Sequence, residues 1–98
     1  MQISVSDIVR STAGHDKGEI FFVVGCGNGF VQVANGKTRK VEKPKTKKVI
    51  HVRLEKSLEG PVSDKIRNGE IVSNIEIRKA LAVYKQGLDE MEGGMHLG

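Results

Sequence analysis

Residues 5–24 read VSDIVRSTAGHDKGEIFFVV, and this stretch decides the fold. Two apolar runs, residues 5–9 and 20–24, enclose a polar segment that begins at Gly14 and ends at Gly18. Runs rich in β-branched and aromatic residues on either side of a glycine-containing turn are typical of a strand, a loop and a strand. Glycine supplies positive φ angles, or lets another backbone such as a phosphate chain come close. The stretch therefore predicts a strand-loop-strand unit whose loop has little room for side chains.

Three segments of this stretch carry a family resemblance: Ser6-Asp7-Ile8-Val9-Arg10, Gly14-x-Asp16-Lys17-Gly18 and Phe22-Val23-Val24. Together they resemble the KOW motif. KOW domains are small SH3-like barrels of large-subunit ribosomal proteins and transcription elongation factors, in which strand, loop and strand present basic and backbone groups to RNA. The family often has a further glycine after the one matched by Gly18, and here residues 19–22 read EIFF. An ordinary glycine-containing hairpin in an unrelated small β domain is the alternative.

Strand and turn signals continue up to residue 54. Residues 25–29 read as a glycine turn and residues 30–34 as a third strand with alternating polarity. Asn35 and Gly36 both tolerate positive φ and predict a hairpin into a fourth strand over residues 37–41, which residues 43–46 break at Pro44. Residues 48–54 then read as a fifth strand that closes a barrel. We expect a mainly β protein with a C-terminal helix, in which residues 1–54 form a small SH3-like β-barrel of KOW type with about five strands.

The second half of the chain reads as helical. A short helix is expected from Pro61 to Ile66, ending at residues 68–69, after a linker over residues 57–60. Ser73 and Glu76 have the spacing of a capping box, and the apolar residues that follow recur every three or four positions on one face: Ile77, Leu81, Tyr84 and Leu88. Gly87 marks the expected end of this helix.

These signals divide the rest of the chain into a helical extension over residues 55–92, packed on the barrel, and a flexible tail over residues 93–98. The alternative is that the long helix docks a protein partner. A barrel followed by a helix with residues 74–81 reading NIEIRKAL is similar to small bacterial KOW-domain proteins. Those proteins resemble large-subunit ribosomal proteins of the archaeal and eukaryotic type, and the resemblance implies contact with a ribosomal protein through the C-terminal helix.

Composition restricts the class of protein. The chain has 98 residues, enough for one domain with an appendage, and 38% of them are apolar, which is ordinary for a globular protein. No apolar run reaches the length of a membrane span, and the N-terminus lacks the basic and apolar regions of a secretion signal. Cys26 is the single cysteine, so an intrachain disulfide is impossible. We expect a cytoplasmic protein without a membrane partner.

Positive charge is concentrated in residues 37–48. This segment has seven cations and one anion, whereas the rest of the chain is slightly acidic and the net charge is +4. A localised basic segment indicates a polyanionic partner. A solvated basic loop that only aids solubility is the alternative.

Catalytic groups do not assemble in the sequence. His15, His51 and His96 lie far apart without metal-ligand spacing, and Cys26 lies in the expected glycine turn. We therefore expect no enzyme activity, no metal and no cofactor.

RNA is the expected partner, because cations bind phosphates and glycine loops let a nucleic acid approach the backbone. The chain has few aromatic residues for base stacking, and of the adjacent Phe21 and Phe22 one is expected to face inward and the other outward. This favours recognition of folded RNA by shape. The resemblance to KOW-containing ribosomal proteins implies that the target is rRNA of the large ribosomal subunit and that the protein is ribosome-associated and acts in translation. The expected RNA-binding residues are Arg10, Gly14, His15, Lys17, Gly18, Lys37, Arg39, Lys40, Lys43, Lys45, Lys47 and Lys48.

Two other partners stay open from the sequence. SH3-like barrels also act as protein-interaction modules that hold proline-rich peptides in aromatic grooves, although aromatic residues are scarce here. The same cations would also bind DNA without sequence preference.

Overall fold

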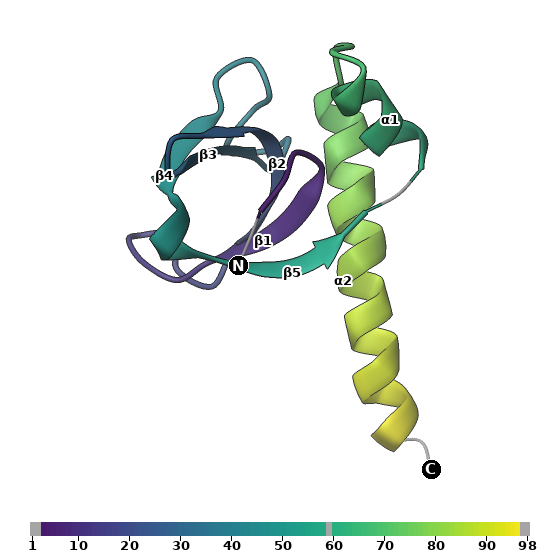
Figure 1. Cartoon of the computed structure of the whole chain (residues 1–98). Helices are drawn as coiled ribbons and strands as arrows, with labels where there is room; N and C mark the ends of the chain where they lie inside the picture. Colours follow the sequence, from purple (N-terminus) through teal and green to yellow (C-terminus); the bar gives the residue numbers. More distant parts are fainter. Residues whose placement is uncertain (1–2, 59, 97–98) are drawn as a thin grey trace.

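Five antiparallel strands form one sheet in the order β4-β3-β2-β1-β5, and a long C-terminal helix lies against it (Figure 1). The computed structural model describes residues 3–58 and 60–96, with the side chains of Pro61 and of residues 89–96 left out. The protein is thus a small mainly β domain with a C-terminal helix, as expected. Its elements are β1 (Asp7–Ser11), β2 (Ile20–Gly27), β3 (Phe30–Ala34), β4 (Lys45–Lys48), η1 (Val49–His51), β5 (Val52–Ser57), α1 (Pro61–Arg67) and α2 (Asn74–His96).

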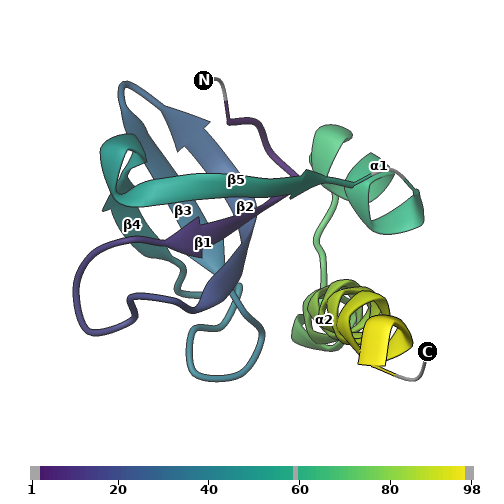
Figure 2. The ribbon, with the colours of Figure 1, turned by 90° about the horizontal axis from the view of Figure 1, so that it is seen from below.

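The sheet is covered on both faces. Successive side chains of a strand point to opposite faces, so neighbouring core residues belong to different clusters. One cluster lies on the concave face and includes Val9, Phe21 and Val33. The other lies between the sheet and the helices, where Phe22 packs with Ile77 and its neighbours. Figure 2 shows α2 end-on beside the sheet. Both phenylalanines are therefore buried, and the expectation that one of them is exposed is wrong, because α2 covers the second face.

The β2–β3 hairpin differs from the expected glycine turn. Strand β2 continues to Gly27, so Cys26 lies in a strand and pairs with Val31. The turn consists of Asn28 and Gly29 alone, with φ angles of 53° and 81°. Two residues with positive φ match the right-handed twist of paired strands, which explains so tight a connection.

The expected fourth strand over residues 37–41 is absent, and β4 is instead formed by the residues after Pro44. The side-chain oxygen of Asn35 accepts hydrogen bonds from the backbone N–H groups of Lys37 and Arg39, both at 2.9 Å. These N–H groups are thus diverted from a strand ladder. Strands β3 and β4 do pair, from Lys45 onward, but through a loop over residues 35–44, so the predicted tight turn at Asn35 and Gly36 is wrong.

The first and fifth strands are displaced along the chain from their expected positions. Strand β1 starts at Asp7, because Ser6 has a φ of 76° and its neighbours form a turn with a 3.1 Å hydrogen bond from the Asp7 N–H to the Ser4 carbonyl. Residues 49–51, expected as strand, form the 3-10 helix η1, and β5 runs to Ser57. The expected domain boundary between residues 54 and 55 therefore falls inside β5.

The two helices begin where the sequence predicts. Helix α1 spans Pro61–Arg67, and α2 follows a capping box in which the Glu76 N–H donates to the Ser73 hydroxyl at 3.1 Å. Helix α2 does not end at Gly87 but continues to His96, because a glycine costs a helix only about 1 kcal/mol. Residues 93–96 of the expected tail are thus helical, and residues 97–98 lie outside the described residues. In the described part of the chain, no helix has the length and apolar character needed to cross a membrane.

Candidate nucleic-acid interface

The β1–β2 loop (residues 12–19) contains the glycines that the sequence singled out. Gly14 and Gly18 have φ angles of 88° and 92°, a region that favours glycine. Backbone hydrogen bonds close the loop, among them one of 2.8 Å from the Gly18 N–H to the Ser11 carbonyl. His15 and Lys17 are exposed at its surface. The loop is therefore a folded turn that presents one imidazole and one ammonium group.

Asp16 joins this loop to β4. Its carboxylate accepts hydrogen bonds from the ammonium groups of Lys45 and Lys47, each at 3.0 Å, and from the Ser11 hydroxyl at 2.7 Å. Burial opposes ionisation of Asp16, but these three donors outweigh it and hold the pKa of the carboxyl well below its usual range. Asp16 is therefore an anion that holds the loop and the basic strand together.

This ion-paired cluster changes the role of two predicted RNA-binding residues. The Lys47 side chain is only 7% exposed, and its ammonium also reaches the Ala13 carbonyl at 3.3 Å. Lys45 is half-buried, at 35%. A lysine that lies inside the protein against a carboxylate has little charge to offer a phosphate, so Lys47 is a structural residue in this position.

Arg10 is also engaged within the protein. Its guanidinium donates to the Gly18 carbonyl at 2.7 Å and to the Glu55 carboxylate at 3.0 Å. Glu55 accepts further hydrogen bonds from Arg53 and from the Tyr84 hydroxyl of α2. The hydrogen bond from Arg10, followed by those of Tyr84 and Arg53, outweighs burial and lowers the pKa of Glu55 to about 2. Arg10 therefore fastens the β1–β2 loop to β5 and α2.

The β3–β4 loop (residues 35–44) is held by α2. A Cβ atom on Gly36 would lie 2.3 Å from the Asn74 carbonyl oxygen, so only glycine fits against the start of this helix. The Asn74 side chain accepts a 2.7 Å hydrogen bond from the Val41 N–H and donates to the Glu42 carboxylate at 2.7 Å. Loop and helix thus form one structural unit, which fixes the cations that the loop carries.

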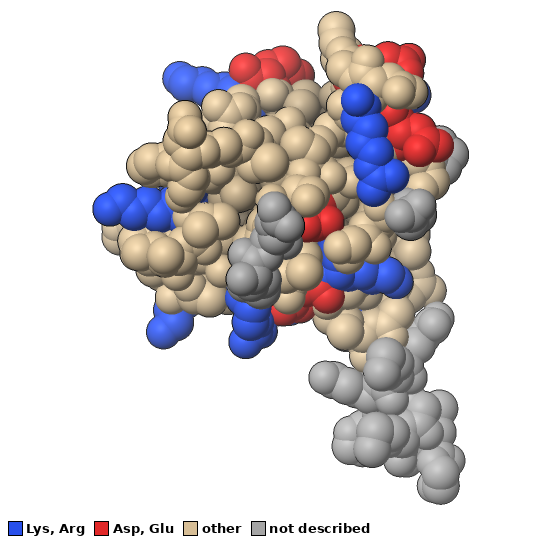
Figure 3. Space-filling view, in the orientation of Figure 1, with Lys and Arg blue, Asp and Glu red and all other residues tan. Residues whose placement is uncertain are grey.

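Five of the predicted lysines remain exposed on the two loops and β4: Lys17, Lys37, Lys40, Lys43 and Lys48. Arg39 is half-buried. The face seen in Figure 3 is mostly uncharged, and separate lysine and arginine side chains lie on it together with several acidic ones. The cations on this face therefore form no single dense patch.

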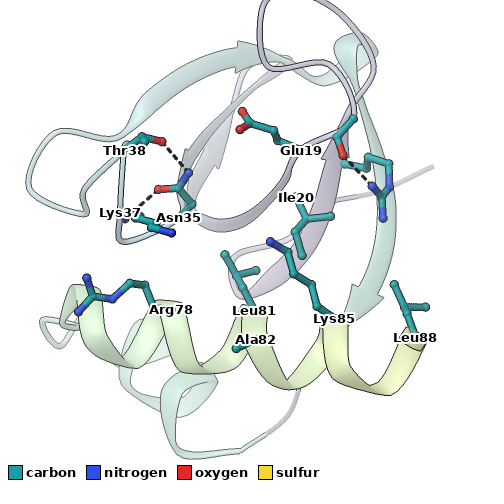
Figure 4. A pocket seen from close by; sticks show the side chains of 12 residues that line it. Glu19, Ile20, Asn35, Lys37, Thr38, Arg78, Leu81, Ala82, Lys85 and Leu88 are labelled. Carbon is teal, nitrogen blue, oxygen red and sulfur yellow. Dashed lines mark hydrogen bonds between the residues drawn. The ribbon is translucent and has the colours of Figure 1, made fainter. Parts of the chain in front are cut away.

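A groove lies between the sheet and α2, with a volume of about 760 Å³. We name it the sheet–helix groove. Its charged lining consists of the cations Arg10, Lys37, Arg78 and Lys85 and one carboxylate, Glu19. In Figure 4 Lys85 rises from α2 toward the sheet, and Arg78 extends from the same helix at the other end of the groove.

The sequence reasoning missed Arg78 and Lys85. The signal was their separation of seven residues, which is close to two helical turns and sets both side chains on one face of α2. Only the tertiary structure brings that face opposite Lys37.

Metal-binding groups do not assemble among the described residues. No group of three or more histidine, cysteine or carboxylate side chains within this part of the chain is placed to hold a metal ion. His15, His51 and Cys26 are each exposed, on the β1–β2 loop, on η1 and on β2.

In comparisons with known proteins, no family model and no curated protein matches the chain.

Proposed function

We propose that this protein binds structured RNA without catalysing a reaction, and that its partner is rRNA of the large ribosomal subunit in the cytoplasm. One observation carries the proposal. Asp16 links the glycine-containing β1–β2 loop to the basic β4, and five lysines remain exposed on the β1–β2 loop, the β3–β4 loop and β4. Fixed cations bind phosphates at a lower entropic cost than mobile ones, because fewer side chains and loops have to be ordered on binding.

The proposal includes the finer fold, an SH3-like barrel of KOW type. The strands β4 and β5 lie at opposite edges of the sheet, and η1 connects them. Two hydrogen bonds of 2.9 Å hold this connection, from the Val49 N–H to the Gly29 carbonyl and from the Thr12 N–H to the His51 carbonyl. They support a sheet that curves until its edges approach. An experimental structure with these two bonds broken and the sheet flat would contradict the barrel.

Recognition is expected to depend on phosphates rather than on base sequence. Phe21 and Phe22 are buried, and Tyr84 donates its hydroxyl hydrogen to Glu55. Phe30 is 44% exposed and is the one phenylalanine at the surface. Base-specific RNA binding generally uses several exposed rings, so affinity should vary little between RNAs of equal length and shape.

The same observation weakens the protein-interaction alternative. A groove for proline-rich peptides needs several aromatic side chains side by side. Among the described residues only Phe30 is positioned at the surface for such a contact. We expect titration with a proline-rich peptide to give no saturable binding.

Salt-dependent RNA binding tests the proposal. Neutralisation of four exposed lysines, in the variant Lys17→Gln/Lys40→Gln/Lys43→Gln/Lys48→Gln, should weaken binding to a structured RNA. The slope of log K against log salt should also become shallower, by about 0.9 for each phosphate that the protein no longer neutralises. The matched control replaces the same four lysines by arginine and should keep the wild-type slope. Equal affinity of the glutamine variant and the wild type would reject the charge argument.

Sedimentation of the tagged protein in a cell lysate tests the ribosomal partner. Migration with the large subunit at low salt, weakening as salt rises, is expected for electrostatic binding to rRNA. Migration near the top of the gradient at both salt concentrations would contradict ribosome association.

A further inference from the structure

We propose that the sheet–helix groove binds the sugar–phosphate backbone of an RNA strand, and that Arg78 and Lys85 of α2 are contact residues. The inference rests on the proposed function and adds a second contact region to it. In the KOW-like segment the cations come from strands and loops, whereas here half of the cationic lining comes from the helix.

Charge is the first argument. Four cations and one carboxylate line the groove, and Lys37, Arg78 and Lys85 form no ion pair within the part of the chain that the structure describes. This differs from the Asp16 cluster, where the anion is part of the protein. Cations that outnumber the carboxylates of a groove raise the local concentration of a negatively charged ligand.

The distribution of these cations favours a chain of anions over a single small anion. Arg78 and Lys85 are separated by seven helical residues, which corresponds to about 10.5 Å along α2. Lys37 faces them from the β3–β4 loop (Figure 4). In Figure 4 the side chains of Arg78 and Lys85 do not converge on one point, an arrangement that suits successive phosphates of a polymer better than one small anion.

The uncharged lining fits the rest of a nucleic-acid backbone. Ile20 and Leu81 lie between the cations, and none of the described residues that line the groove is aromatic. Apolar surface suits the carbon face of a ribose, and the missing rings leave no platform for base stacking. The groove therefore favours contact with sugar and phosphate.

Both walls of the groove are fixed before a ligand binds. The Asn35 side chain holds the turn that carries Lys37, and Gly36 packs against the start of α2. Arg10 holds Gly18 at the other wall. The groove thus exists without a ligand, which lowers the ordering cost of binding.

The test compares RNA binding of the wild type and Arg78→Gln/Lys85→Gln, with a uridine oligonucleotide of about 24 residues and an RNA hairpin of equal length as probes. Removal of two cations that neutralise phosphates should weaken binding about 15- to 30-fold at about 0.15 M salt, and should reduce the salt slope by about 1.4 to 1.8. The variant Arg78→Lys/Lys85→Arg keeps both charges and should bind within about threefold of the wild type.

A matched control removes two charges elsewhere. Lys56 and Lys79 are exposed and do not line the groove, so Lys56→Gln/Lys79→Gln has the same net charge as the groove variant. Its affinity should fall by less than about threefold. An equal fall in the two double variants would overturn the proposal, because the effect would then come from net charge alone.

The outcomes separate the groove from the proposed function. If the Lys17/Lys40/Lys43/Lys48 variant weakens binding and the Arg78/Lys85 variant does not, the groove is excluded and RNA binding by the loops stands. If the wild type binds neither probe, both proposals fail. Tighter binding of the wild type to poly-L-glutamate than to either RNA would assign the groove to an acidic protein and overturn its assignment to RNA.

Discussion

The two loops that carry the predicted interface are held by different physical forces. The β1–β2 loop is fastened by charge, through Asp16 with two lysines and through Arg10 with Glu55. The β3–β4 loop is fastened by fit, because Gly36 lies against the Asn74 carbonyl, and by the Asn74 side chain. The first loop should therefore respond to acid, and the second to the addition of a single methyl group.

This difference also separates cations that serve the fold from those available to a ligand. Lys45 and Lys47 are paired with Asp16 and thereby hold the β1–β2 loop in position. The lysines of the β3–β4 loop remain exposed, because the position of that loop does not depend on their charge. A run of lysines in a sequence can thus contain lysines that stabilise the fold and lysines that are available to a ligand, and composition alone does not distinguish the two kinds.

The largest expected effect is at the tightly fitted loop. Gly36→Ala should destabilise the protein by about 4–5 kcal/mol, from a positive φ of 75° and from a Cβ that meets a helix carbonyl. Gly29→Ala is the control, because its φ is 81° and no atom lies within 4 Å of the added Cβ. It should cost only about 1–2 kcal/mol. Urea unfolding measures both, and equal destabilisation would show that the close approach to α2 has no energetic weight.

Removal of the charge at Asp16 should be the next largest effect. Asp16→Asn leaves the ammonium of Lys47 inside the protein without its anion, which should cost about 3–4 kcal/mol. Glu19→Gln is the control, because Glu19 is an exposed carboxylate of the same loop. It should change the free energy of unfolding by less than about 0.5 kcal/mol. If the two variants are equally stable, the β1–β2 loop is not held by charge.

The sequence predicted what depends on local pattern. The strand-loop-strand unit, the capping box at Ser73 and the helix α1 follow from neighbouring residues, and all are present. The β3–β4 loop could not be predicted, because the partner of the Val41 N–H is Asn74, 33 residues away. The same holds for the burial of Lys47, since only the fold brings Asp16 beside β4. The sequence therefore located the cations along the chain but could not distinguish the exposed ones from those that the fold buries or engages.

Acid should loosen the charge-fastened loop. Glu55 ionises with a pKa of about 2 in the folded protein, against an ordinary pKa of 4.5, so the unfolded chain takes up a proton while the folded protein does not. Glu55 alone should thus lower the stability by about 3 kcal/mol as the pH decreases from about 5 to 2, and Asp16, whose pKa is also lowered, adds to this fall. Urea unfolding at a series of pH values measures this. Glu55→Gln should make the dependence shallower without abolishing it, because Asp16 remains, whereas Gly36→Ala should leave the slope unchanged. A slope that Glu55→Gln does not alter would contradict the assignment.

The smallest effect should lie within the Asp16 cluster itself. Lys45 and Lys47 contact the same carboxylate at the same distance of 3.0 Å, but their side chains are 35% and 7% exposed. Water and salt screen the more exposed pair, so Lys45→Gln should cost only about 0.5 kcal/mol and should cost less still at high salt. Lys47→Gln should cost several times more, because its contact is shielded from solvent. Urea unfolding of the two variants at low and high salt compares them directly. Equal costs would mean that burial does not decide the strength of these ion pairs, and that both lysines belong to the fold to the same degree.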